Sequence, residues 1–229
     1  MGIIDDNLKK INNRIASICS EFGRNRDVIT LVGISKTMGP EAIMEAWLAG
    51  LKNFGENRIQ EASKKIHQVE KGPTWHMVGH LQTNKVKKAV DLFDIIESVD
   101  SLRLAETISG ECEKKGKEIK VLLEVNSSGE TTKYGLEPDE VLLIAEQINR
   151  LDNLKLSGLM TVGPFTDDLE QIDKSFALTQ KLFGKMQDKF GVQIKTLSMG
   201  MSADFERAIK FGSTELRIGT AIFGKRNNQ

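Results

Sequence analysis

The sequence contains few of the residues on which several protein classes depend. Its 229 residues include two cysteines, three histidines and one tyrosine. Cys19 and Cys112 both lie in segments with helical periodicity, which predicts two reduced, partly buried thiols and argues against a disulfide framework. The three histidines form no cluster with the cysteines, so we expect no zinc centre and no other metal site.

The sequence also lacks net charge, because 32 basic residues balance 32 acidic ones. A balanced charge gives no overall field that attracts nucleic acid or an anionic membrane. The basic run 85–88 is interleaved with and followed by apolar residues, which is typical of the solvated face of an amphipathic helix. With no charged leader and no apolar run of membrane-spanning length, we expect a soluble cytoplasmic protein without nucleic-acid or membrane partners.

What the sequence does contain is a regular alternation of strand and helix patterns. A first helix is predicted over 1–23, where Gly23 follows one apolar stripe made of Ile4, Leu8, Ile11, Ile15, Ile18 and Phe22. Eight short apolar runs come next, each with its own helical segment, and they begin near Ile29, Asn53, Trp75, Ile95, Ile119, Lys155, Thr196 and Glu215.

Eight such units in about 200 residues predict an α/β fold, a closed parallel (β/α)8 barrel of the TIM type. An open doubly wound sheet is the alternative, but neither GxGxxG nor GxxxxGK[ST] occurs, which also disfavours a dinucleotide or nucleoside-triphosphate site. No linker or change in composition divides the chain. One domain is therefore expected over 1–229, with the helix at 1–23 packed on the barrel.

The segment 196–224 holds two copies of one pattern. Gly200 and Ser202 precede a helical segment at 203–211, and Gly219 and Thr220 precede another at 221–223. Glycine allows close approach of a ligand, and helix N-termini offer free N–H groups, so two adjacent turns of this kind suit a phosphate. In (β/α)8 barrels this is a common place for one. The alternative is two ordinary strand–turn–helix junctions with capping hydroxyls.

Lys36 and Arg217 are the candidate groups for chemistry at the same barrel mouth. Lys36 follows the first strand with the parity of Val32 and Ile34, so it is expected to point to their side. Partial burial near other cations lowers a lysine pKa and makes the amine a nucleophile toward carbonyls. The alternatives are a lysine that reaches from a strand end to water, and, for Arg217, an internal ion pair with a carboxylate.

A nucleophilic lysine beside a phosphate site suggests pyridoxal 5′-phosphate (PLP), or a Schiff-base aldolase that acts on a sugar phosphate. Arg217 lies two residues before Gly219, close enough to face the far side of a ring whose phosphate sits at Gly219 and Thr220. A guanidinium that faces a pyridine nitrogen donates a hydrogen bond and leaves that nitrogen unprotonated, which weakens the ring as an electron sink.

Eight segments of the chain resemble the YggS/PROSC group of pyridoxal phosphate homeostasis proteins. They occur in the family's order and cover nearly all of the chain after the first helix: LVGISKT (31–37), FGENRIQE (54–61), WHMVGHLQTNK (75–85), SVDS (98–101), VNSSGETTKYG (125–135), SGLMTVGPF (157–165), SMGMSADFERAI (198–209) and LRIGTAIFG (216–224). Tyr134 is one departure, since a smaller residue is more usual there, and it touches no expected cofactor contact.

The resemblance implies a fold-type III barrel, like the N-terminal domain of alanine racemases, with PLP held as a Schiff base. It assigns the covalent bond to Lys36, the phosphate to Ser202, Gly219 and Thr220, and the lining of that turn to Gly200 and Met201. It also places Arg217 at the pyridine nitrogen and Asn57 beside the ring. No catalytic residue is expected.

The family's role is PLP (vitamin B6) homeostasis or delivery, with apo-enzymes as possible recipients, and no established reaction. A PLP-dependent amino-acid racemase is the alternative function. Racemisation needs acid/base groups on both faces of the cofactor, and racemases of this fold take the second from a tyrosine in a further domain. Here the only tyrosine is Tyr134, and His80 would be its substitute. A monomer is expected.

Overall fold

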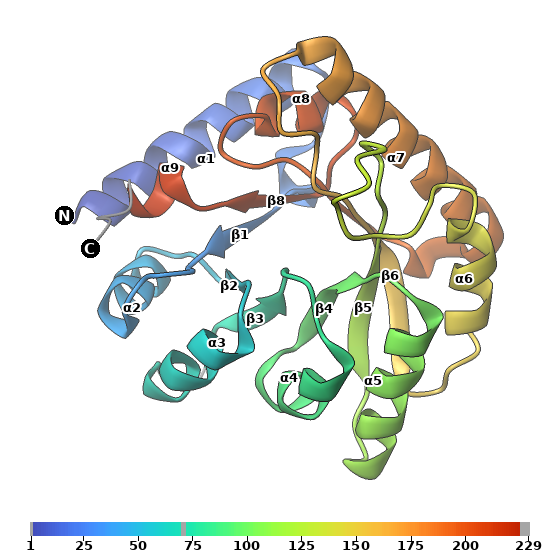
Figure 1. Cartoon of the computed structure of the whole chain (residues 1–229). Helices are drawn as coiled ribbons and strands as arrows, with labels where there is room; N and C mark the ends of the chain where they lie inside the picture. Colours follow the sequence, from blue (N-terminus) through green and yellow to red (C-terminus); the bar gives the residue numbers. More distant parts are fainter. Residues whose placement is uncertain (1, 70–71, 225–229) are drawn as a thin grey trace.

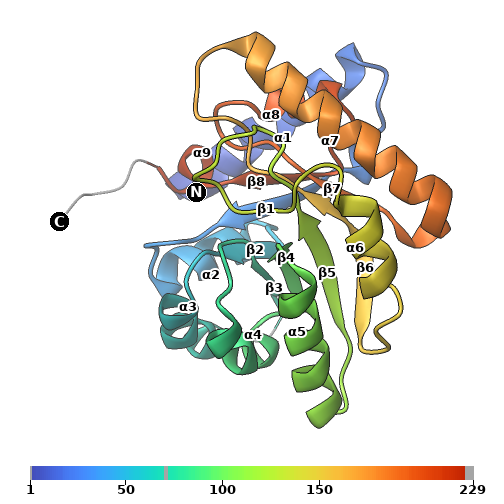
Figure 2. The ribbon, with the colours of Figure 1, turned by 45° about the vertical axis from the view of Figure 1, so that its right-hand side comes forward.

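The computed structural model describes residues 2–69 and 72–224, and its centre is a closed barrel of eight parallel strands (Figures 1 and 2). Neighbouring strands along the chain pair with each other, and β1 pairs with β8 to close the barrel. The strands are β1 Thr30–Ile34, β2 Asn53–Glu56, β3 Thr74–Met77, β4 Ile95–Val99, β5 Ile119–Glu124, β6 Leu154–Met160, β7 Thr196–Ser198 and β8 Glu215–Ile218.

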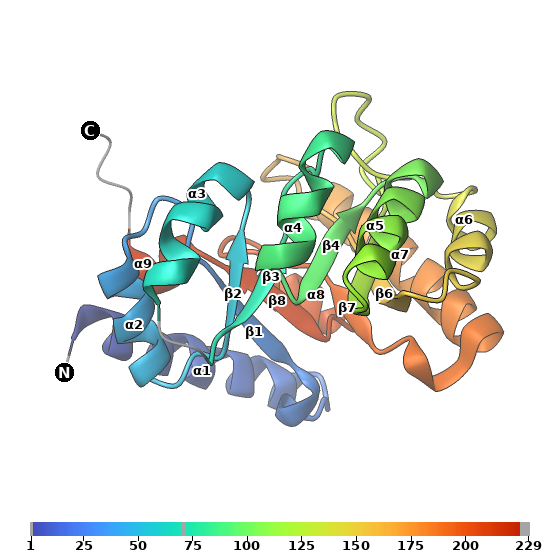
Figure 3. The ribbon, with the colours of Figure 1, turned by 90° about the horizontal axis from the view of Figure 1, so that it is seen from below.

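Helices separate the strands along the chain and form the outer layer of the molecule (Figure 3). They are α1 Ile3–Glu21, α2 Pro40–Leu48, α3 Ile59–Lys65, α4 Val86–Leu92, α5 Leu102–Lys114, α6 Val141–Ile148, α7 Leu169–Phe190, α8 Phe205–Lys210 and α9 Thr220–Phe223. The apolar core lies between this layer and the strands. In α7, for example, Ile172, Phe176, Phe183 and Met186 are buried.

The first helix packs against the last part of the chain. Its apolar stripe is buried, and α1 lies against α2, α8 and α9 (Figures 1 and 3). Asn7 Nδ2 donates to the carbonyl of Ile222 in α9 at 3.0 Å, and Arg14 Nε contacts Glu206 Oε1 in α8 at 2.6 Å. Helix α1 therefore supports the two short helices that follow β7 and β8.

The expected barrel and N-terminal helix are confirmed, with small differences at element ends. Helix α8 begins at Phe205, because residues 202–204 form a turn in which Met201 N donates to Asp204 Oδ1 at 2.6 Å. Helix α9 begins at Thr220, one residue earlier than expected. Cys19 and Cys112 are both buried and free. Among the described residues, no helix is long and apolar enough to cross a membrane.

Candidate functional site

Lys36 lies in the loop that follows β1, at the carboxyl ends of the strands. A Cβ placed on Gly55 of β2 would lie 2.6 Å from Ile34 Cδ1 and 3.2 Å from Val32 Cγ1, so these two side chains lie over Gly55. Lys36 has their parity along the chain, as the sequence predicted, and is half-buried. The carboxyl end of the strands is where (β/α)8 barrels carry their functional groups.

Lys65, at the end of α3, holds the loop that carries Lys36. Its ammonium donates to the carbonyl of Ser35 at 2.7 Å and to that of Met38 at 3.3 Å, and it pairs with Glu56 and Glu61 at 2.8 Å each. The side chain is almost fully buried, so these contacts also satisfy a charge that would otherwise be costly there. Lys65 therefore fixes the loop on both sides of Lys36.

The backbone of the same loop takes an unusual conformation. Thr37 has φ 69°, in the left-handed region that residues other than glycine rarely adopt. Its N–H donates to Glu61, and Ser35 Oγ donates to buried Glu56 Oε1 at 2.5 Å. Burial raises the pKa of Glu56, although Lys65 acts against the shift. Strained backbone of this kind persists where surrounding contacts determine it, and it is common at functional sites.

The two glycine–hydroxyl turns lie next to each other at the ends of β7 and β8. Ser202 Oγ accepts a hydrogen bond from the backbone N–H of Ala221, in the first turn of α9, at 3.4 Å. A Cβ on Gly219 would lie 3.4 Å from the Cβ of Ile34, so this turn also adjoins the end of β1. Thr220 is exposed beside them. The structure thus brings the hydroxyl turns to the strand that leads to Lys36.

Gly200 is required by its conformation as well as by packing. Its φ is 100°, and a Cβ there would lie 2.5 Å from Ala208 Cβ and 3.1 Å from Leu216 Cδ2. Its carbonyl accepts from Arg217 N at 3.0 Å, which joins the first turn to β8. Met201 follows with its side chain partly exposed. These glycine and methionine positions line the turn that carries Ser202.

The Arg217 side chain is buried at the carboxyl ends of β6 and β7. Nη1 donates to Ser198 Oγ at 2.6 Å, and Nη2 donates to the carbonyl of Thr161 at 2.7 Å. Glu97 Oε2 lies 4.0 Å from Nη1. The internal ion pair weighed from the sequence is therefore present, with Glu97. It holds the guanidinium in one orientation at the mouth and so is compatible with a ligand role.

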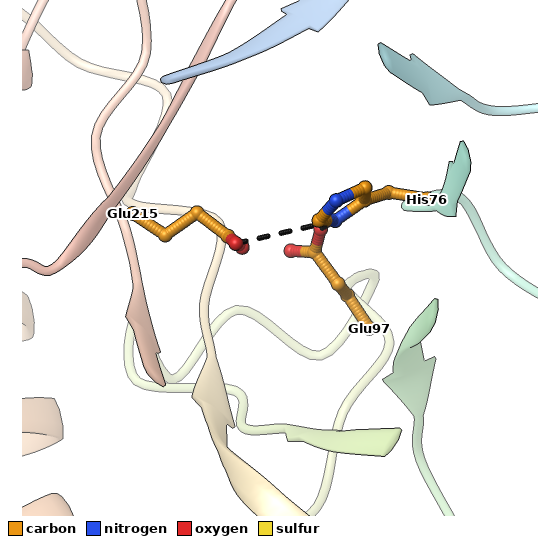
Figure 4. Close-up of side chains that lie close together, drawn as sticks. All are labelled: His76, Glu97 and Glu215. Atoms are coloured by element: carbon orange, nitrogen blue, oxygen red, sulfur yellow. Dashed lines mark hydrogen bonds and ion pairs between the residues drawn. The ribbon is translucent and has the colours of Figure 1, made fainter. Parts of the chain in front are cut away.

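A chain of hydrogen bonds runs from Arg217 down into the barrel. Ser198 Oγ donates to Glu97 Oε2 at 2.7 Å, and Glu97 Oε1 lies 2.7 Å from His76 Nδ1 (Figure 4). Burial acts against both charges, but the hydrogen bond between them raises the pKa of His76 and lowers that of Glu97. Glu215 lies beside this pair, and burial together with Glu97 raises its pKa to about 8.

Asn57 and a polar cleft complete the mouth beyond β2 and β3. Asn57 Oδ1 is buried without a hydrogen-bond partner among the described residues. A cleft of about 770 Å³ is lined by Asn57, Arg58, His80, Lys85 and Tyr134 together with their neighbours. Tyr134 stacks on His80, with ring centroids 3.7 Å apart and planes 11° apart. The one tyrosine thus covers a histidine in this cleft.

Sequence reasoning missed the residues that support the site. Lys65 holds the loop of Lys36, and Ser198 and Thr161 hold the side chain of Arg217. Lys65 looks like one of several lysines on an amphipathic helix. The one available signal was its place in the buried register of α3, where Ile59 and Ala62 are also buried.

Comparisons with known proteins agree with this geometry. Residues 7–227 match the family described as alanine racemase, N-terminal domain. The chain is 40% identical over 222 residues to the pyridoxal phosphate homeostasis protein of Aquifex aeolicus, which covers 96% of this chain and 97% of the relative. The structure of PipY of Synechococcus elongatus with PLP bound is 34% identical, covers 93% of this chain and 100% of PipY, and has a TM-score of 0.82.

The more distant likeness to racemases concerns the fold alone. An alanine racemase of Clostridium difficile is 19% identical, with a TM-score of 0.76, and covers 98% of this chain but 58% of the racemase chain. The common part is the barrel, and the racemase continues beyond it.

Proposed function

This chain belongs to the family of pyridoxal phosphate homeostasis proteins, and we propose that it binds PLP covalently at Lys36 and acts in PLP (vitamin B6) homeostasis without catalysing a reaction of its own. The PLP bound in the structure of PipY, a relative of similar length, supports this assignment. In this proposal one barrel supplies every residue that holds PLP.

The residues at the mouth have the chemistry that PLP requires. A phosphate needs hydroxyl and N–H donors, and Ser202, Thr220 and the turn at Gly219 lie together at the ends of β7 and β8. The ring needs a partner for its nitrogen, which Arg217 supplies in the proposal. Asn57 Oδ1, buried without a partner among the residues described, has unused acceptor capacity beside the expected ring.

The observation that carries the proposal is the convergence of three strand ends. Gly219 after β8 packs on Ile34 of β1, two residues before Lys36. Ser202 after β7 contacts the first turn of α9. A phosphorylated aldehyde is a ligand that uses an amine and a phosphate site at one mouth. Bound PLP supplies an electrophilic carbonyl to the lysine amine and a conjugated ring.

Arg217 is the residue that favours a carrier over an enzyme. A guanidinium stays protonated, so in the proposed site it donates to the ring nitrogen and leaves that nitrogen without a proton. Ser198, Thr161 and Glu97 hold it in place, which keeps this donor fixed. A ring with an unprotonated nitrogen withdraws electrons weakly, so the site suits holding PLP more than demanding carbanion chemistry.

Racemase activity is the second candidate function, and the position of Tyr134 argues against it. Racemisation requires acid/base groups on opposite faces of the cofactor. Tyr134 is stacked on His80, and His80 Nδ1 lies 3.0 Å from Asp100 Oδ2, so both candidate groups are engaged with each other and with a carboxylate. We propose a monomeric carrier whose recipients are PLP-dependent apo-enzymes.

The first test is borohydride reduction of the purified protein, followed by peptide mass mapping. We expect a phosphopyridoxyl group on Lys36, and none in Lys36→Ala, which should fold normally because a half-buried lysine in a loop adds little to core packing. Lys85→Ala, a lysine that lines the neighbouring cleft, is the matched control and should keep the adduct.

Three outcomes would contradict parts of this proposal. An adduct that persists in folded Lys36→Ala would refute the assignment of the lysine. The absence of any adduct after incubation with PLP would favour a Schiff-base aldolase acting on a sugar phosphate. Interconversion of alanine enantiomers by the purified protein would favour the racemase.

A further inference from the structure

Three buried ionisable side chains face one another inside the barrel, below Arg217, which Glu97 approaches to 4.0 Å. His76 of β3, Glu97 of β4 and Glu215 of β8 are at most 4% exposed. His76 Nδ1 lies 2.7 Å from Glu97 Oε1 and 4.0 Å from Glu215 Oε2 (Figure 4). One potential ligand atom from each residue lies within 4.8 Å of the others.

The surroundings of His76 define what lies between it and Glu97. Its Nε2 lies 3.3 Å from Asn53 Oδ1, and in the tautomer with a hydrogen on Nε2 that hydrogen is donated to this oxygen. In a neutral imidazole, Nδ1 is then a lone pair, and it faces a carboxylate oxygen at 2.7 Å. Two acceptors at this distance require a positive centre between them. That centre is either a proton or a metal ion.

Glu215 distinguishes the two cases. Its Oε1 is buried and has no hydrogen-bond partner among the described residues, while its Oε2 points to His76 Nδ1 (Figure 4). With only a proton between His76 and Glu97, Glu215 Oε1 keeps no partner, at a cost of about 1–3 kcal/mol for a buried polar group. A divalent ion bound by both oxygens of Glu215 satisfies this atom together with His76 and Glu97.

We propose that His76, Glu97 and Glu215 bind a divalent transition-metal ion at the floor of the barrel, with Zn²⁺ as the ion that tests the site. Zn²⁺ takes imidazole nitrogen and carboxylate oxygen at about 2.0–2.2 Å in tetrahedral geometry, so two of its ligand atoms lie roughly 3.4 Å apart. His76 Nδ1 lies 4.0 Å from Glu215 Oε2 and 2.7 Å from Glu97 Oε1, on either side of this value, so binding needs small rotations of both carboxylates. One nitrogen and two oxygens without a thiolate suit Zn²⁺ and its first-row neighbours.

The groups around the three ligands are those of a metal site. A ligating histidine commonly donates its other N–H to an oxygen, as Nε2 does to Asn53, and ligating carboxylates are themselves hydrogen-bonded, as Glu97 Oε2 is by Ser198. These contacts fix the orientation of the ligands before any ion arrives.

An entry path reaches the site from the amino ends of the strands. A cavity of about 630 Å³ is lined by His76 and Glu215 and by the first residues of several strands, among them Thr30, Asn53 and Thr196. Lys120, Lys155 and Lys195 at its rim are exposed to solvent, which screens their repulsion of a cation. The cavity leaves room for water to complete the coordination.

No zinc centre was expected from the sequence, because the three histidines form no cluster with the cysteines. Here each ligand comes from a different strand, and only closure of β8 onto β1 brings Glu215 opposite β3 and β4. None of the three ligands is a proposed PLP contact, although Glu97 also lies 4.0 Å from Arg217 Nη1. The role of the metal site is to join β3, β4 and β8.

The test is zinc titration of the untagged full-length protein after treatment with a chelator and dialysis. We expect one Zn²⁺ per chain with a Kd of about 1 µM or below by calorimetry, and a rise in Tm on addition of Zn²⁺. Glu215→Gln keeps the size of the side chain and should weaken binding at least about 10–100-fold, and Asn53→Ala should weaken it about tenfold. Co²⁺ should give a visible absorption spectrum of a nitrogen–oxygen site.

Two matched controls separate this site from others that could take zinc. His80→Gln alters a histidine that pairs with Asp100 at the other end of the barrel, and Lys36→Ala removes the proposed PLP anchor; both should bind Zn²⁺ as the parent does. Circular dichroism of each metal-free variant reports folding. A folded Glu215→Gln that binds Zn²⁺ as tightly as the parent, or a parent that binds none at about 10 µM, would overturn the proposal and leave a proton between His76 and Glu97.

Discussion

The two ends of this barrel differ in charge and in how the chain builds them. At the mouth, Lys36 follows β1 and Arg217 lies in β8, and the hydroxyls of Ser202 and Thr220 follow β7 and β8 next to loops that solvent reaches. At the floor, Glu97 and Glu215 lie inside strands together with His76, and all three are buried. The mouth suits an exchangeable anion, whereas the floor suits a permanent contact. Removal of a floor residue should therefore lower stability, and removal of a mouth residue should lower ligand affinity.

The largest expected effect tests the floor. His76→Ala leaves Glu97 buried without its partner, so the free energy of unfolding should fall by about 3–5 kcal/mol, as measured by urea denaturation. His80→Ala at the mouth is the control. Its pair with Asp100 is partly exposed and should contribute less than about 1 kcal/mol. Equal losses of unfolding free energy in the two variants would show that the two ends do not differ in their contribution to stability.

The next effect tests the mouth. Ser202→Ala with Thr220→Ala removes two donors to a dianion, and each loss should weaken PLP binding about 10–100-fold, since a hydrogen bond to a charged group contributes about 1.5–3 kcal/mol. Equilibrium dialysis measures the affinity, and urea denaturation should show unchanged stability. Thr30→Ala with Thr196→Ala removes two hydroxyls from the floor cavity and should leave affinity unchanged. Unaltered PLP affinity in the first double variant would refute the phosphate site.

The smallest effect concerns Glu124, the last residue of β5, at the mouth. Burial, aided by the charge of Asp100, raises its pKa to about 7 from 4.5. The folded protein thus holds this proton more tightly than the unfolded chain does. The stability that the group contributes is complete below about pH 4.5 and is lost as the pH rises toward 7.

Glu124→Gln cannot ionise, so it should gain stability relative to the parent between about pH 5 and 7, by at most about 1.4 kcal/mol per pH unit. Urea denaturation at pH 5, 6 and 7 measures the difference. Glu137→Gln makes the same substitution at an exposed glutamate and is the control. A flat profile for Glu124→Gln would mean that water reaches the Glu124 carboxyl.

The difference between mouth and floor also explains which parts of the molecule could be predicted from the sequence. The barrel follows from eight apolar runs with their helices, and the structure has a strand at each run. Lys36 and Gly219 directly follow such runs. Because the carboxyl ends of parallel strands meet at one end of a barrel, the sequence alone places both residues at the mouth. The assignment of PLP contacts to them stays a prediction.

The floor cluster and the support of the mouth could not be found in this way. His76, Glu97 and Glu215 are 21 or more residues apart along the chain, and each has at least one apolar neighbour within its strand. The contacts of Lys65 with Ser35 and Met38 likewise depend on how α3 packs behind β1 and β2. Such contacts follow from strand register and helix packing, which local patterns do not determine.

The packing of α1 on α8 and α9 has a consequence for synthesis on the ribosome. Asn7 and Arg14 near the start of the chain contact Ile222 and Glu206 near its end, and α8 and α9 follow the turns that hold Ser202 and Thr220. Helix α1 leaves the ribosome first and cannot pack on α8 and α9 until they are synthesised. In the same way, β1 cannot pair with β8 until the end of the chain. Nascent chains that stop before β8 therefore expose the apolar stripe of α1, and we expect chaperones and proteases to bind them. They also lack part of the proposed ligand site, so they should not bind PLP.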